Sequence, residues 1–263
     1  MMNTNSWGIN WDLRKVNTAT KYPSIPTYHV LGDRGILTEE RSCEFEGGIY
    51  LTEKVDGANS RLIITNEYDY LLGSREELLY ASGDLLWNPA QHIAEPMIEL
   101  AREVCERYLP SPMMVFYFEC YGGSNNGKIY GAKPSFRLFD MWAMNWQKFQ
   151  ELHDGNGIEQ ISSWRQNGGQ PFDSVDRIER VDTWYGFEPV PYLAMMDASD
   201  LPETVEDTYD FLRGHISITH CATDDSRQGR AEGLVVRDKS RNTIAKIRFE
   251  DYERTLRKRG VIK

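Results

Sequence analysis

The sequence is poor in the features that mark secreted, membrane-bound and zinc-binding proteins. Its 263 residues include four cysteines without paired spacing, which predicts reduced thiols and neither a disulfide framework nor a zinc site. No run is long and apolar enough to cross a bilayer, and the first residues lack the apolar segment of a signal peptide. These absences predict a cytoplasmic protein without a membrane anchor.

An excess of positive charge is also missing. The net charge of -10 argues against a protein that coats nucleic acid nonspecifically, because phosphate binding requires clustered lysine and arginine. A local basic groove is still compatible with this balance. Hydrophobic residues make up 40% of the chain, which is enough for the core of one large domain or two small ones.

Apolar, β-branched and aromatic runs predict strands, and helical spacing predicts a smaller number of helices. The expected strands are 48–53, 61–65, 68–73, 113–120, 136–142, 233–237 and 243–249, and the expected helices are 89–108, 147–152, 201–213 and 254–263. The first two strands are expected to form a hairpin, and so are the last two. The segment before residue 46 and the rest of 145–169 are expected to be irregular. This mixture predicts one α+β domain around antiparallel sheet.

Lys54 opens the phrase Lys54-Val55-Asp56-Gly57, directly after the strand expected over residues 48–53. A lysine at a strand end beside a turn can present its amine to a pocket. Such an amine is a nucleophile only when it is neutral, which burial and nearby positive charge favour. The tetrad alone is common by chance, and most lysines are solvated surface charges. Its meaning therefore depends on the phrases that follow.

Four more phrases follow in a fixed order. They are Phe118-Glu119-Cys120-Tyr121-Gly122, Phe136-Arg137-Leu138-Phe139-Asp140, Glu232-Gly233-Leu234-Val235-Val236-Arg237 and Lys246-Ile247-Arg248. The series resembles the motifs of the covalent nucleotidyltransferases, which comprise the ATP-dependent DNA and RNA ligases and the mRNA capping enzymes. The resemblance spans residues 49–249 and implies the nucleotidyltransferase (ligase adenylylation-domain) fold, with antiparallel sheets and flanking helices.

The resemblance implies a role for each matching charged residue. Lys54 would attack the α-phosphorus of ATP, expel pyrophosphate and keep AMP as a phosphoramidate, while Lys246 and Arg248 would neutralise phosphate charge. The family pattern has lysine where this sequence has Arg248, and a planar guanidinium contacts phosphate differently. Glu232 would hold Mg²⁺ or Mn²⁺, because a carboxylate before an apolar strand is costly unless it binds something.

Three more residues are implied to contact the nucleotide. Glu119, inside an apolar run, would bind the ribose hydroxyls, with pairing to a core arginine as the alternative. Phe136 would stack on the purine, and an ordinary core position is the alternative. Glu53 would help to read the base through its backbone, and the choice between ATP and GTP stays open. Asp140 is expected to be structural.

Asn59 and Arg75 favour RNA over DNA as the substrate. DNA ligases commonly carry arginine two residues after the motif glycine, whereas Gly57-Ala58-Asn59 is similar to the phage RNA ligases that seal nicks in duplexes. In that branch the asparagine and a downstream arginine, matched here by Arg75, engage the RNA 5′-phosphate end. The alternative for Arg75 is a surface charge beside a turn. A capping enzyme fits less well, since it ordinarily uses a following OB-fold module.

These patterns predict a single nucleotidyltransferase domain over residues 1–263, without an OB-fold module and with a basic tail at about 250–263. Its grip on RNA would come from its own face, from a protein partner, or from the tail, which a solvated helix explains equally well. The tail residues are Arg254, Arg257, Lys258, Arg259 and Lys263.

The predicted activity is the joining of RNA 5′-phosphate and 3′-hydroxyl ends through lysyl-AMP and adenylylated RNA, in RNA repair. The alternatives are an adenylylating or nucleotide-dependent scaffold subunit of an RNA-repair complex, a noncatalytic RNA-binding protein, or a minimal DNA ligase.

Overall fold

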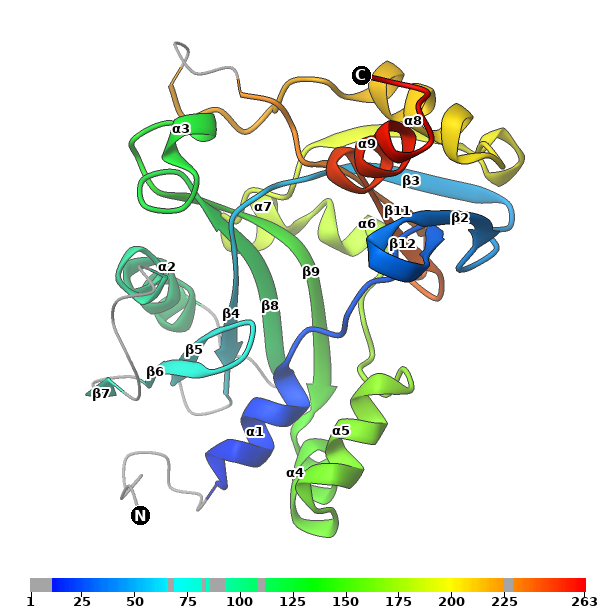
Figure 1. The fold of residues 1–263 in the computed structure, drawn as a ribbon. Helices are drawn as coiled ribbons and strands as arrows, with labels where there is room; N and C mark the ends of the chain where they lie inside the picture. The colour runs from blue at the N-terminus through cyan, green and yellow to red at the C-terminus, as the bar shows by residue number, and fades with distance from the viewer. Residues whose placement is uncertain (1–10, 66–68, 82–83, 86–92, 108–111, 225–228) are drawn as a thin grey trace.

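A computed structural model describes residues 11–65, 69–81, 84–85, 93–107, 112–224 and 229–263, and two antiparallel sheets dominate it (Figure 1). One sheet has the strand order β10-β3-β11-β12 and the other β7-β6-β5-β4-β8-β9, while β1 and β2 form a small ribbon. The strands are β1 (His29–Leu31), β2 (Leu37–Arg41), β3 (Gly48–Lys54), β4 (Ala58–Ile64), β5 (Tyr70–Ser74), β6 (Leu78–Ala81), β7 (Asp84–Leu85), β8 (Pro112–Tyr121), β9 (Ser135–Asn145), β10 (Tyr192–Asp197), β11 (Gly233–Asp238) and β12 (Ile244–Arg248).

Helices pack against both faces of the six-stranded sheet and against the four-stranded sheet. They are α1 (Leu13–Thr20), α2 (Ala94–Arg107), α3 (Gly127–Tyr130), α4 (Trp146–Gly155), α5 (Ile158–Gln166), α6 (Val175–Ile178), α7 (Val181–Tyr185), α8 (Val205–His215) and α9 (Phe249–Lys258). The predicted α+β class with antiparallel sheets is confirmed. None of the helices in the described ranges is long and apolar enough to cross a membrane.

The six-stranded sheet is buried on both faces, which explains why β8 is a continuous apolar run. Alternate residues of a strand point to opposite faces. Met114, Phe116 and Phe118 pack in the cluster that contains α2, whereas Val115 and Tyr117 pack in the cluster that contains α1, α4 and α5. Residues 113–118 of this strand are therefore apolar on both faces.

The expected hairpin around Lys54 is wrong. β3 belongs to the four-stranded sheet and β4 to the six-stranded sheet, so the chain crosses from one sheet to the other between Lys54 and Ala58. The crossing is tight: a Cβ atom at Gly57 would collide with the carbonyl oxygen of Cys120. This glycine is required because the backbones approach closely there, and not because a hairpin turns. The second expected hairpin, β11 with β12, is confirmed.

Two segments expected to be irregular contain regular structure. The first 46 residues include α1, whose N-cap is Asp12, and the ribbon β1–β2. Residues 145–169 form α4 and α5, where only a short helix was predicted. The local sequence of both segments is polar, so their helices depend on the few apolar side chains that reach the core, such as Val16, Phe149 and Ile161.

The remaining expected elements differ mainly at their boundaries. The strand predicted from residue 68 is β5, and residue 68 itself lies outside the described residues. The helix predicted over 89–108 is described as α2, with Pro96 in its first turn, where a missing N–H is tolerated. Residues 86–92 and 108–111 at its two ends lie outside the described ranges.

The basic tail is not a free arm. Phe249, Tyr252 and Leu256 of α9 are buried against the four-stranded sheet, together with α8. Three of the five basic side chains are engaged in ion pairs within the chain: Arg254 with Glu250 and Asp251, Arg257 with Glu253, and Arg259 with Glu39. Their charge is therefore largely compensated before any partner binds.

Candidate active site

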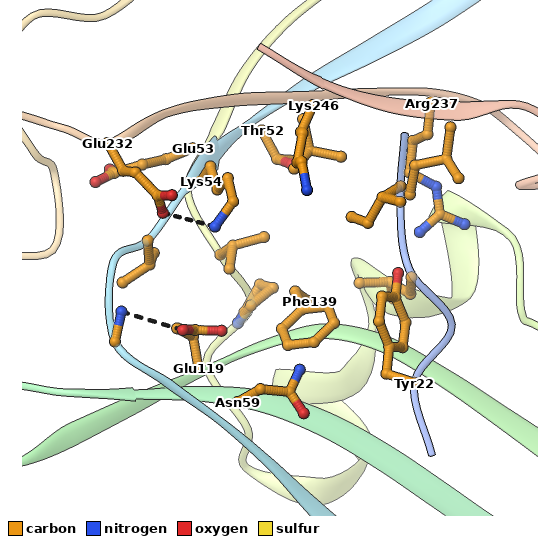
Figure 2. Close-up of a pocket in the computed structure, with 18 of the residues that line it drawn as sticks. Tyr22, Thr52, Glu53, Lys54, Asn59, Glu119, Phe139, Glu232, Arg237 and Lys246 are labelled. Carbon is orange, nitrogen blue, oxygen red and sulfur yellow. Dashed lines mark hydrogen bonds and ion pairs between the residues drawn. The ribbon is translucent and has the colours of Figure 1, made fainter. Parts of the chain in front are cut away.

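A cavity of about 420 Å³ lies between the two sheets (Figure 2). Strands β3, β11 and β12 supply one wall, and β4, β8 and β9 supply the other. Residues 22–25, which follow α1, close one side. Because β3 ends at Lys54 and the chain then crosses to the opposite sheet, Lys54 stands where the two walls meet.

Lys54 and Glu232 form an ion pair inside this pocket. The Lys54 Nζ atom lies 2.6 Å from Oε2 of Glu232, and both side chains are mostly buried. The strands explain the contact, because Gly233 pairs with Lys54 in the sheet and Glu232 directly precedes it. Burial raises the pKa of Glu232, and the positive charge of Lys54 limits that rise. The pair links the first and fourth sequence phrases, which are 178 residues apart.

Lys246 projects into the pocket from β12, opposite Glu119 and Asn59 (Figure 2). Burial lowers the pKa of its amine, and the charges of Arg248 and Lys54 lower it further. No ion pair engages this amine within the described part of the chain. The Lys246 amine is therefore free to contact an anionic ligand. Arg248 differs, since its Nε and Nη2 atoms bind the Asp251 carboxylate at 2.7 and 2.9 Å.

Glu119 faces Lys54 from the opposite wall. Its Oε1 atom accepts a hydrogen bond of 3.0 Å from the N–H of Gly57, so it also fixes the crossing between the sheets. Burial raises the pKa of Glu119 to about 7, although Lys54 opposes the shift. Among the described residues, the Glu119 carboxylate contacts the backbone amide of Gly57 and forms no ion pair with a core arginine.

The raised pKa of Glu119 predicts a pH-dependent stability. The folded chain holds this proton more tightly than the unfolded chain, so the free energy of unfolding falls as pH rises from about 4.5 to about 7. We expect Glu119→Gln, which keeps an acceptor for Gly57, to raise the free energy of unfolding by about 2 to 3 kcal/mol at about pH 8 and by almost nothing near pH 4. Urea denaturation across pH, with exposed Glu151→Gln as the control, measures this. An equal gain at both pH values would contradict it.

Asn59 and Arg75 both line the pocket. This position is necessary for the predicted contact of both residues with the RNA 5′-phosphate. Asn59 lies beside Glu119 in the pairing of β4 with β8, and its buried Oδ1 has no hydrogen-bond partner among the described residues. Arg75 stands in the turn after β5, where its Nη2 atom donates a hydrogen bond of 3.2 Å to Ser24 Oγ. Its guanidinium is largely exposed at the rim, so a ligand can reach it.

The side chain of Glu53 points away from the pocket. Its carboxylate accepts hydrogen bonds from the hydroxyl of Thr219 and from the His220 N–H, the latter at 2.8 Å. Its own backbone N–H donates to the carbonyl of Pro191 at 2.9 Å. Glu53 therefore fixes neighbouring segments around the pocket, and its backbone N–H is already used within the chain.

Phe136 does not line the pocket; Phe139 does (Figure 2). Phe136 packs against the core of the six-stranded sheet, with its ring 6.0 Å from that of Phe118. Strand alternation explains this: Phe136 pairs with Cys120 and lies with it in the core cluster, whereas Phe139, three residues later, lies on the opposite face. β9 also has a β-bulge, since Tyr117 pairs with Asp140 but the next residue, Phe118, pairs with Leu138. Phe139 is the additional residue, and a bulge changes which face the following side chains occupy.

Tyr22 and Arg237 also line the pocket and were not predicted from the sequence. Both are bound to the fully buried Asp140: the Tyr22 hydroxyl at 2.9 Å and Arg237 Nη1 at 3.4 Å. Arg241 forms a third contact with the same carboxylate. The structural role predicted for Asp140 agrees with these contacts. Only Arg237 carried a signal, because it ends the fourth sequence phrase.

Comparison with known families identifies the chain. The family model for RNA ligase matches residues 47–249, which contain all five sequence phrases. The chain belongs to the RNA ligase family. Comparison with curated proteins gives no match.

Solved RNA ligase structures share the fold. An RNA ligase from Naegleria gruberi, determined with ATP and manganese, superposes with a TM-score of 0.51 at 15% identity, over 92% of this chain and 64% of that one. An archaeal ATP-dependent RNA ligase gives 0.51 at 16% identity, over 88% of this chain and 49% of that one. At these identities the likeness shows the fold. The chain spans about two thirds and about half of these two proteins.

The chemistry of Glu232 suits the divalent metal expected in an RNA ligase. Carboxylate oxygen is a ligand that Mg²⁺ and Mn²⁺ accept, and Mg²⁺ is commonly held by one or two carboxylates together with substrate phosphates. No group of three or more histidine, cysteine, aspartate or glutamate side chains that could hold a metal occurs among the described residues. A metal here would therefore need oxygens from the nucleotide as well as Glu232.

Proposed function

We propose that the chain is an ATP-dependent RNA ligase that joins 5′-phosphate and 3′-hydroxyl ends, and that it acts as a single nucleotidyltransferase domain. The observation that carries the proposal is the meeting of Lys54, Glu232 and the uncompensated Lys246 in one pocket between the sheets. These residues come from three separate phrases of a chain in the RNA ligase family. ATP and Mg²⁺ or Mn²⁺ are the proposed nucleotide and metal. The solved Naegleria structure contains ATP and manganese.

In the first step, the Lys54 nitrogen attacks the α-phosphorus of ATP. A phosphorus–nitrogen bond forms, the bond to the pyrophosphate oxygen breaks, and the amine proton leaves. Glu232 Oε2 at 2.6 Å is in position to hold that proton. Lys246 would stabilise negative charge on the phosphoryl oxygens, and a bound metal would supply further positive charge there. Glu119 would bind the ribose.

Two further transfers complete the proposed reaction. An oxygen of the RNA 5′-phosphate attacks the AMP phosphorus, and the bond to Lys54 breaks. The RNA 3′-hydroxyl then attacks the 5′-phosphate, and AMP leaves as the strand is sealed. Asn59 and Arg75 lie on the pocket wall and rim, where they would hold the 5′-phosphate during both steps. With three tail arginines engaged in ion pairs, additional grip on RNA would come from this face or from a protein partner.

Sealing assays test this proposal. We expect the purified chain, with ATP and Mg²⁺, to join a 5′-phosphorylated RNA in a nicked duplex or in a single strand, and to leave 5′-hydroxyl RNA unjoined. Arg75→Ala should lower sealing about tenfold, because a charge-assisted phosphate contact is lost, while exposed Arg14→Ala should not. Preferred sealing of DNA would overturn the choice of RNA. Covalent labelling without sealing of any end would favour an adenylylating subunit of a repair complex.

A further inference from the structure

The part of the pocket lined by Tyr192 carries a carboxylate that no step of the proposed reaction uses. Five carboxylate side chains belong to residues that line the pocket. Glu53 and Asp56 are close to Lys54 in the sequence, and Glu119 and Glu232 lie near it in the pocket. The fifth is Glu179, directly after α6.

Glu179 and Tyr192 both line the pocket. The pKa of the Tyr192 hydroxyl is raised, first by partial burial and then by the negative charge of Glu179. Tyr192 pairs with Thr52 of β3. Thr52 precedes Lys54 by two residues, which is about 7 Å along a strand. A nucleoside joined through its phosphate to Lys54 is long enough to cover this distance along the pocket.

The Glu179 carboxylate is available for a ligand. No hydrogen bond or ion pair engages it among the residues that the structure describes. The nearby amine of Lys239 binds Asp176 instead, at 2.7 Å. The Glu179 backbone is fixed, because its N–H donates to the carbonyl of Val175 at 2.9 Å. Glu179 is exposed, so its carboxylate is an acceptor open to solvent as well as to a ligand, on an anchored backbone.

Apolar side chains line the pocket that contains Lys54 and Glu179. They come from both walls, from α6 and from the segment before β10, and include Phe139, Ile178, Val190 and Val235. Such a lining suits a planar base, which gains from contact with aromatic and aliphatic surfaces on its faces and keeps its polar groups at its edge. A hydrogen-bond acceptor at the edge of this pocket can then distinguish bases by the group that each presents there.

We propose that Glu179 selects adenine over guanine by accepting a hydrogen bond from the 6-amino group of the base. The inference rests on the proposed nucleotide site at Lys54. Adenine presents an N–H donor at this position. Guanine presents a carbonyl oxygen there, which a carboxylate repels, so the same side chain attracts one base and disfavours the other.

Equilibrium binding tests the proposal without requiring turnover. Calorimetry would compare ATP, GTP and purine riboside 5′-triphosphate, which lacks the 6-amino group, on the wild type, Glu179→Ala, Glu179→Gln and the exposed control Glu151→Gln. We expect the wild type and the control to bind ATP about tenfold more tightly than either analogue. Glu179→Ala should reduce both preferences to within about twofold. Glu179→Gln should improve GTP binding, because its amide adds a donor.

Two results would overturn the proposal: a wild type that binds ATP and the purine analogue equally, or a Glu179→Ala variant that keeps the full preference for ATP. Covalent labelling of the same samples separates this inference from the proposed function. A wild type that prefers ATP through Glu179 but takes no label would refute the ligase proposal and leave the adenine site standing. A chain that labels normally while Glu179→Ala keeps its preference would refute the adenine site alone.

Discussion

Replacing Lys54 by alanine is expected to abolish covalent labelling of the chain by α-labelled ATP and Mg²⁺. The label sits on the attacking nitrogen, and loss of a nucleophile typically lowers turnover by a factor of about a thousand or more. Denaturing gels of wild type and Lys54→Ala read the result directly. The fold should survive, because Glu232 keeps Arg248 at 3.7 Å as a second cation and the Lys54 side chain is not part of an apolar cluster.

Lys148→Ala is the matched control, since Lys148 is an exposed lysine of α4. It should label like the wild type. Label that persists on Lys54→Ala would assign the nucleophile to another residue. Absence of label on the wild type with ATP, GTP and NAD would refute the proposal that the chain is an enzyme. The chain would then be a binding or scaffold protein.

Replacing Asp140 by alanine is expected to lower the free energy of unfolding by about 3 to 5 kcal/mol, the usual cost of breaking a buried charge pair. The Asp140 side chain is fully buried, and its partners Arg237 and Arg241 are 5% and 9% exposed. Its removal leaves two guanidinium groups without a carboxylate in a site that water hardly reaches. Urea denaturation of the wild type and the variant measures the loss.

Asp176→Ala provides the matched control for this experiment. Asp176 also pairs with a cation, the Lys239 amine at 2.7 Å, but both side chains are about half exposed. An exposed pair contributes less than about 1 kcal/mol, because water and salt screen it. A similar loss in the free energy of unfolding in the two variants would show that the contacts around Asp140 stabilise the fold no more than a surface ion pair does.

Local patterns were sufficient to predict most of the strands, and the resemblance of the motifs predicted the charged residues Lys54, Glu119, Glu232 and Lys246 that line the pocket. The run 113–120 predicted β8 because apolar residues are required on both faces of a covered sheet. The two strand-like runs predicted the hairpin of β11 and β12, and in its turn the Asp238 carboxylate accepts N–H bonds from Ser240, Asn242 and Thr243. Such signals are local, so they survive in a single sequence.

Other features depend on long-range packing and left weaker signals. α4 and α5 are polar helices that form because a few side chains, including Phe149 and Ile161, reach the core. Lys54 and Gly57 were read as one hairpin, because a glycine after a strand fits either a turn or a close approach to another backbone. Nothing in the local sequence separates those two cases.

The sequence by itself predicted the family, the α+β class and the residues Lys54, Glu119, Glu232 and Lys246, which line one pocket, because these residues belong to ordered phrases. The tertiary structure decided which other side chains join them. The position of β9 in the sheet turns the face with Phe139 to the pocket and the face with Phe136 to the core, and the packing of α6 brings Glu179 to the pocket. Strand register and helix packing depend on contacts between distant segments, so one sequence does not reveal them locally.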